Sequence, residues 1–125
     1  MKTLNELSPS IDVAVLAAQV GSDPAVLRDL LNEFGRSARA VVAELMRASA
    51  GGQVERVRAL AHKLTSSAYA VGACALGQLC VELAVLAASE QRTRVQELAG
   101  RLAAEMGQVE LALAAADAAL KETTL

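Results

Sequence analysis

Apolar residues recur at intervals of three and four along most of this chain, which is the repeat of one face of an α-helix. The first segment with this repeat is expected to reach about Ala50 and contains Leu27, Leu30, Leu31, Phe34, Val41, Val42 and Leu45. The second contains Val54, Val57, Leu60, Ala61, Leu64, Ala68 and Val71. The third contains Leu76, Leu79, Cys80, Leu83 and Leu86. The last and longest contains Val95, Leu98, Leu102, Met106, Val109, Leu113 and Leu120. Because no alternating run of β-branched residues separates them, we predict an all-α chain.

Turn-forming residues mark the ends of these segments. Asp23 is suited to cap the first helix, with Pro24 at its first position. Gly51-Gly52 are suited to end that helix, and Gly72 to end the second. Four amphipathic helices joined by short breaks predict an antiparallel four-helix bundle over residues 21–120. We expect residues 1–20 to form a lead-in with a short helix across one end of the bundle, and residues 121–125 to form a frayed tail.

Composition narrows the class of protein further. At 125 residues the chain suits one domain with a single core. Its net charge of −2 and the absence of a basic stripe argue against nucleic-acid binding. No apolar signal peptide begins the chain, so we expect a cytoplasmic protein. We also expect a monomer. Residues 68–88 are apolar, but Glu82 within them favours a buried bundle helix over a membrane span.

The two cysteines, Cys74 and Cys80, lie six residues apart on one predicted helix. At about 100° per residue they lie near opposite faces of that helix, so they cannot form a disulfide with each other. We expect both to be reduced core residues of a cytosolic protein.

The chain has one histidine, His62, in the second helical segment. At about 100° per residue it falls roughly 140° from the centre of the apolar arc of its helix, so the imidazole is predicted to be exposed. Its neighbours on that face are Glu55, Arg58, Thr65, Ser66 and Tyr69.

Several kinds of chemistry could use a lone exposed histidine. The simplest alternative is a surface residue without a role. A metal site lacks a second histidine and a carboxylate four residues after His62, and the cysteines are predicted on another helix and facing inward. A catalytic triad lacks its other members. Proton transfer by the imidazole is chemically possible, but a bundle of this kind offers no evident cleft.

The residues from 61 to 83 share the spacing of a known signature, which reads H-x-L-K-G-S/A-S/A and then G-A/L-x-x-L-x-x-x-C-x-x-L/I. The matching positions are Ala61-His62-Lys63-Leu64, Ser67, Gly72-Ala73, Leu76, Cys80 and Leu83. In these residues the chain resembles the histidine-containing phosphotransfer (HPt) domains of bacterial and fungal phosphorelays, and the predicted four helices extend the likeness over most of its length.

The resemblance implies that His62 accepts a phosphoryl group from the aspartate of a receiver domain and passes it to a second receiver. An exposed imidazole suits this role, because it is largely neutral and nucleophilic at pH 7. By the same resemblance the domain has no kinase activity and binds no metal or cofactor, since the receiver supplies Mg²⁺. The implied partners are response-regulator receiver domains and a hybrid sensor kinase.

Three positions depart from the family pattern. Thr65 stands where the family usually has a lysine that neutralises phosphate charge, and a threonine offers only a hydrogen bond. Arg58 and Lys63 are candidate replacements for that cation, although Lys63 projects about 100° around the helix. Ser66 replaces the usual glycine and narrows access to the ring, and Ala84 replaces a polar residue.

These departures leave competing hypotheses. A pseudo-HPt adaptor would bind receiver domains without accepting phosphate, and a purely structural bundle would bind no receiver at His62. Tyr69, two turns after His62, is either a docking residue or an ordinary side chain at the bundle edge. Our leading hypothesis is a phosphorelay intermediate that carries phosphate on His62. Its predicted phosphate or docking support is Arg58, Lys63, Thr65, Ser66 and Tyr69.

Overall fold

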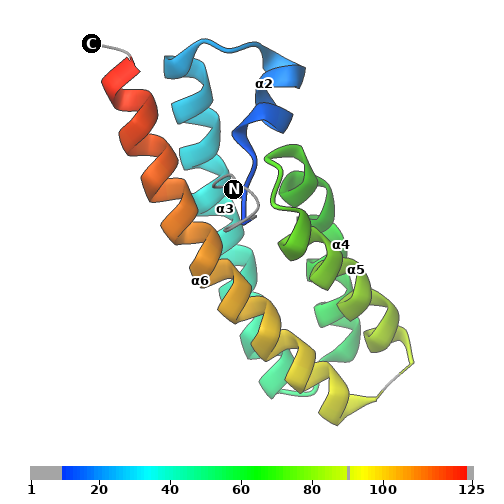
Figure 1. Cartoon of the computed structure of the whole chain (residues 1–125). Helices are drawn as coiled ribbons and strands as arrows, with labels where there is room; N and C mark the ends of the chain where they lie inside the picture. The colour runs from blue at the N-terminus through cyan, green and yellow to red at the C-terminus, as the bar shows by residue number, and fades with distance from the viewer. Residues whose placement is uncertain (1–9, 90, 124–125) are drawn as a thin grey trace, which may run out of the picture.

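The structure is a computed structural model that describes residues 10–89 and 91–123 of the chain. Within those ranges the regular structure is entirely helical, as predicted (Figure 1). The helices are α2 (Val13–Val20), α3 (Pro24–Ala50), α4 (Val54–Ala70), α5 (Cys74–Ala88) and α6 (Arg92–Thr123).

The long helix α3 begins and ends where the sequence predicts. The Asp23 side chain accepts a hydrogen bond of 3.0 Å from the Ala25 N–H, and Pro24 occupies the first turn, where its missing N–H costs nothing. At the other end, the Gly51 N–H donates to the Arg47 carbonyl at 3.0 Å and Gly52 has a φ of +69°. These two glycines turn the chain into α4.

Helices α4 and α5 form a tight antiparallel hairpin. The Ala73 N–H donates to the Ala68 carbonyl at 2.8 Å, and Gly72 between them has a φ of +72°. A Cβ atom at Gly72 would collide with the backbone of Asp12, whose N–H donates to the Val71 carbonyl at 3.3 Å. The segment before α2 thus lies directly on the α4–α5 turn, where only glycine fits.

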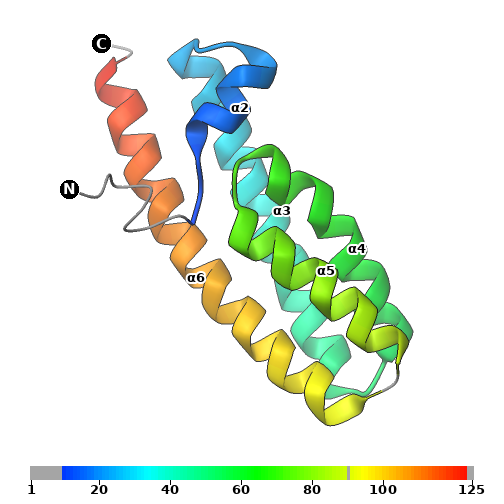
Figure 2. The same ribbon diagram turned by 45° about the vertical axis from the view of Figure 1, so that its right-hand side comes forward.

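Helices α3, α4, α5 and α6 make up the predicted four-helix bundle, in which α6 packs along α3 and beside α5 (Figures 1 and 2). Helices α3 and α6 extend past the α4–α5 hairpin, and α2 lies across that end of the bundle. The Gln19 side-chain amide of α2 donates to the Ala70 carbonyl of α4 at 3.0 Å. The largest fully buried side chains of the core are Leu45, Leu64, Leu76, Leu83, Leu102, Val57, Val95, Val109 and Cys80.

Helix α6 is longer than the sequence suggests. It continues to Thr123, whereas the frayed tail was expected to start at residue 121. Gly100 and Gly107 lie inside this helix without ending it, and both face open space. The first nine residues of the predicted lead-in and the last two of the tail lie outside the described residues. Among the helices described, none is long and apolar enough to cross a membrane.

Candidate functional site

His62 lies on the outer face of α4, as the helical phase predicts. The opposite face of this helix is buried in the core through Val57, Leu60, Ala61, Leu64 and Ala68. His62 follows the buried Leu60 by two residues, which is about 200° around the helix axis. Its imidazole therefore points away from the buried face and is exposed to solvent. A partner protein can therefore reach the ring nitrogens without any opening of the bundle.

Arg58 lies one turn before His62 and forms an ion pair with Glu55. Its Nη2 and Nε atoms donate to Glu55 Oε2 at 2.9 Å and 3.3 Å. The hydrogen bond lowers the pKa of the Glu55 carboxyl and raises that of the Arg58 guanidinium, and the Coulomb attraction acts in the same directions. Both side chains are well exposed, at 48% for Arg58 and 79% for Glu55. The sequence placed Arg58 on this face but did not identify Glu55 as its partner.

Thr65 uses its only hydroxyl proton within its own helix. The hydroxyl donates to the Ala61 carbonyl at 2.9 Å and is partly buried. It therefore has no proton left for a phosphate on His62, although its oxygen can still accept a hydrogen bond. Ser66, one turn after His62, is exposed beside the ring.

Lys63 projects from α4 in a different direction from His62, about 100° around the helix axis. It is exposed, and the structure gives it no ion pair with any described residue. Of the two predicted replacement cations, Arg58 shares the His62 face and Lys63 does not.

Tyr69 joins this face of α4 to α5. Its side chain is 40% exposed, and its ring lies against Gly77, where a Cβ atom would be only 2.9 Å from ring atoms Cε2 and Cζ. Gly77 was not recognised from the sequence as part of this region. A glycine inside an apolar helix is the available signal, because it often marks a close approach of another group.

The outer face of α5 carries exposed apolar side chains. Val81 is 43% exposed and Val85 is 68% exposed. They line one side of a groove of about 590 Å³, whose other side is formed by Leu98 and Arg101 of α6. Helix α5, which carries this apolar surface, packs against both α4 and α6.

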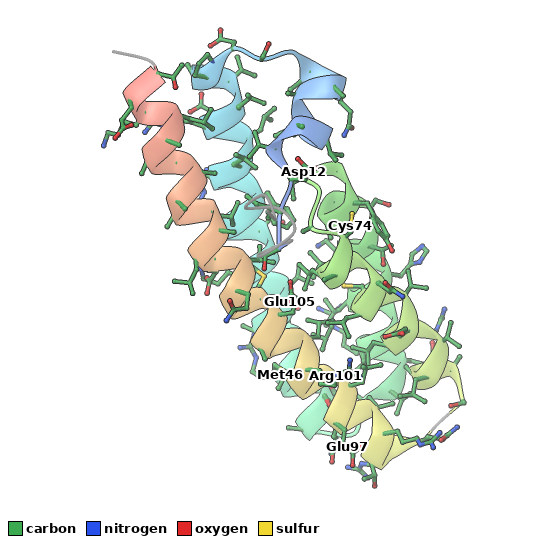
Figure 3. The ribbon with its side chains drawn as sticks, in the orientation of Figure 1. Asp12, Met46, Cys74, Glu97, Arg101 and Glu105 are labelled. Carbon is green, nitrogen blue, oxygen red and sulfur yellow. The ribbon has the colours of Figure 1, made fainter. Side chains whose placement is uncertain are left out.

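The cysteines differ from the prediction. Cys80 is buried, and burial raises the pKa of its thiol to about 12. Cys74 is exposed at the start of α5, so the expectation that both are core residues was wrong (Figure 3). The six-residue separation places Cys74 on the solvent side of α5 when Cys80 faces the core. In the described part of the chain, no group of three or more histidine, cysteine or acidic side chains could hold a metal ion.

Glu105 is a partly buried carboxylate on α6 (Figure 3), whereas His62 is on α4. Partial burial raises the pKa of this carboxyl, against the effect of a hydrogen bond with Ser10. Through this hydrogen bond, Glu105 connects α6 with the residues that precede α2.

Comparison with known protein families agrees with this geometry. A family model described as "Hpt domain" matches residues 29–119, a range that includes His62 and most of the bundle. No curated protein and no solved structure gives a match. The family match covers well over half of the 125 residues, and the observed helical bundle is the architecture of that family. The chain therefore belongs to the Hpt family, the histidine-containing phosphotransfer domains of phosphorelays.

Proposed function

We propose that this protein is a phosphorelay intermediate that carries a phosphoryl group on His62. The observation that carries the proposal is the exposure of this single imidazole on the outer face of α4, within the region of the Hpt match. The buried apolar face of α4 fixes the direction of the ring, because the helix cannot rotate without exposing Leu60 and Leu64.

The proposed step exchanges one bond to phosphorus for another. The lone pair of one ring nitrogen of His62 attacks the phosphorus of an aspartyl phosphate on a receiver domain. The N–P bond forms as the bond between phosphorus and the aspartate oxygen breaks, and the released carboxylate keeps the electron pair. The other ring nitrogen retains its proton. Transfer to a second receiver reverses these changes.

In this proposal the partner supplies the rest of the chemistry. The receiver holds Mg²⁺, which neutralises charge on the transferring group, and the HPt domain contributes the nucleophile without kinase activity of its own. Response-regulator receivers and a hybrid sensor kinase are the proposed partners of a cytoplasmic, monomeric domain that binds neither nucleic acid nor membrane. Tyr69, Ser66 and the exposed valines of α5 offer a mixed apolar and polar surface for docking.

Phosphate transfer from receivers tests this function. The full chain is mixed with receiver domains phosphorylated on aspartate, and phosphate on the chain is followed over time. We expect phosphorylation that is labile in acid and stable in alkali, and none in the His62→Gln variant. Arg56→Gln, which alters the α3 side of the same helix, serves as the matched control and should retain transfer. Phosphate retained by every receiver tested would reject the proposal.

The second candidate is a receiver-binding adaptor that accepts no phosphate. Thr65 favours it, because this residue at the position of the family's lysine has no charge and its hydroxyl already donates to the Ala61 carbonyl. For such an adaptor, His62→Ala would leave receiver affinity and signalling unchanged. For a phosphorelay intermediate, the same variant would bind receivers and abolish signalling.

A further inference from the structure

Arg58 occupies a position on α4 from which it can reach two different partners. Glu55 lies three residues before it and His62 four residues after it, and both separations place side chains next to each other on a helix. In the structure the guanidinium is bound to Glu55, with Nη2 2.9 Å from Oε2. No ion pair joins the imidazole to a residue that the structure describes.

The Arg58–Glu55 pair is easily exchanged. Both side chains are about half exposed or more, and an ion pair in such a position contributes little to stability because water and salt screen it. A phosphoryl group on His62 would offer the same guanidinium two negative charges and three acceptor oxygens. Arginine can bind phosphate through two parallel N–H bonds to two different oxygens, whereas both of its bonds to Glu55 end on the one oxygen Oε2, and one of them is 3.3 Å long.

The other cations of α4 are less suited to this role. Lys63 points about 100° away from the His62 direction. Arg56 lies on the opposite edge of the helix, where it forms an ion pair with Glu44 of α3. Thr65, at the position of the family's lysine, is uncharged and its proton is bound by the Ala61 carbonyl.

We propose that Arg58 leaves Glu55 when His62 is phosphorylated and binds the phosphoryl oxygens, and that Glu55 is a positioning residue that holds the guanidinium beside the ring beforehand. The inference rests on the proposed function of His62. It adds that the cation of this site comes from the turn before the histidine, and that a carboxylate competes for it. No covalent bond changes in this exchange, because only hydrogen bonds and ion pairs are redistributed.

A small phosphodonor tests the exchange without any contribution from receiver docking. The 125-residue chain is treated with phosphoramidate. An imidazole nitrogen forms a bond to phosphorus while the P–N bond of phosphoramidate breaks, and the protonated nitrogen leaves as ammonia with the electron pair of the broken bond. The rate of phosphohistidine formation is measured for the wild type, Arg58→Gln, Glu55→Gln and the double variant. Arg56→Gln is the matched control, because it removes an exposed, paired guanidinium from the other edge of α4.

We expect Arg58→Gln to slow phosphohistidine formation by about threefold to tenfold, from the strength of an exposed charge-assisted contact, and Arg56→Gln to leave it unchanged. Glu55→Gln should speed the reaction by about twofold, and this gain should shrink in the Arg58→Gln background, because the competition needs both residues. In NMR spectra, the Nε–Hε resonance of Arg58 should move on phosphorylation while that of Arg56 stays in place. Circular dichroism confirms that each variant is folded.

The outcomes separate this inference from the proposed function. If the wild type forms phosphohistidine but Arg58→Gln matches Arg56→Gln and the Arg58 resonance does not move, the inference is wrong and the proposed function stands. If the wild type accepts phosphate from neither phosphoramidate nor a phosphorylated receiver, both are wrong.

Discussion

Substitution of Gly77 by alanine should disturb the contact between α5 and Tyr69. Gly77 is buried in α5, and an added Cβ atom would lie 2.9 Å from two atoms of the Tyr69 ring and 3.1 Å from a third. Carbon atoms in favourable contact are about 3.5–4.0 Å apart, so the ring must move. Because Tyr69 is already 40% exposed, the available movement is outward into solvent.

The size of the effect follows from two opposing contributions. An alanine in place of a helical glycine stabilises a protein by about 0.8–1.0 kcal/mol when nothing obstructs the methyl group. Full burial of a large apolar side chain stabilises by about 1.5–3 kcal/mol, so partial displacement of the half-buried ring should cost about 1–2 kcal/mol. We therefore expect Gly77→Ala to lower the free energy of unfolding by between about 0 and 1 kcal/mol. Gly107→Ala, whose methyl meets nothing within 4 Å, is the matched control and should be stabilising.

The chain reports directly on this contact, because Tyr69 is its only tyrosine and it has no tryptophan. Urea unfolding followed by far-UV circular dichroism gives the free energies, and near-UV circular dichroism follows the ring. In a Tyr69→Ala background, Gly77→Ala should become stabilising like Gly107→Ala. The reasoning is refuted if Gly77→Ala stabilises the wild type as much as Gly107→Ala and leaves the Tyr69 signal unchanged.

Three further predictions concern the turn, the buried thiol and the site. Gly72→Ala should destabilise the fold by at least about 1–2 kcal/mol in urea unfolding, because its φ of +72° is strained for alanine and the methyl meets the backbone of residue 12; equal stability would contradict this. Burial raises the pKa of the Cys80 thiol from 9.0 to about 12, so the unfolded chain loses its proton first and stability should fall as pH rises above about 9. The slope should be at most about 1.4 kcal/mol per pH unit, and a Cys80→Ala variant with the same slope would exclude this origin. Thr65→Lys should speed phosphohistidine formation with phosphoramidate by about twofold to fivefold and rescue Arg58→Gln, and no change in either background would rule out a charge deficit at this position.

The bundle could be predicted because local signals agree with one another. The apolar repeat identifies the buried face of each helix, and Asp23, the Gly51-Gly52 pair and Gly72 mark three of the boundaries that the structure shows. The prediction failed for Cys74, although its six-residue separation from Cys80 already places the two on different faces of one helix. Cys74 belongs to an apolar stretch and was therefore expected in the core, but Cys80 lies on the buried face of α5 and Cys74 is left in solvent.

The direction of His62 could also be predicted, since it depends only on helical phase. The contacts around it could not. The spacing allows Arg58 to bind either Glu55 or His62, because residues three and four apart are both neighbours on a helix. The approach of Tyr69 to Gly77 depends on how α5 packs against α4, which no local pattern in the sequence determines.

Thr65 shows why a match of residue types does not fix their chemistry. From the sequence its hydroxyl is a hydrogen-bond donor one turn from the histidine, but a threonine inside a helix can also donate to the carbonyl four residues before it. That carbonyl, of Ala61, is always within reach, whereas a phosphate is present only during transfer, and the hydroxyl is found on the carbonyl. If His62 carries phosphate as proposed, Arg58 in the preceding turn is the cation of α4 that shares its face. Under that proposal, the strength of the Arg58–Glu55 pair would determine how readily the guanidinium is released to His62.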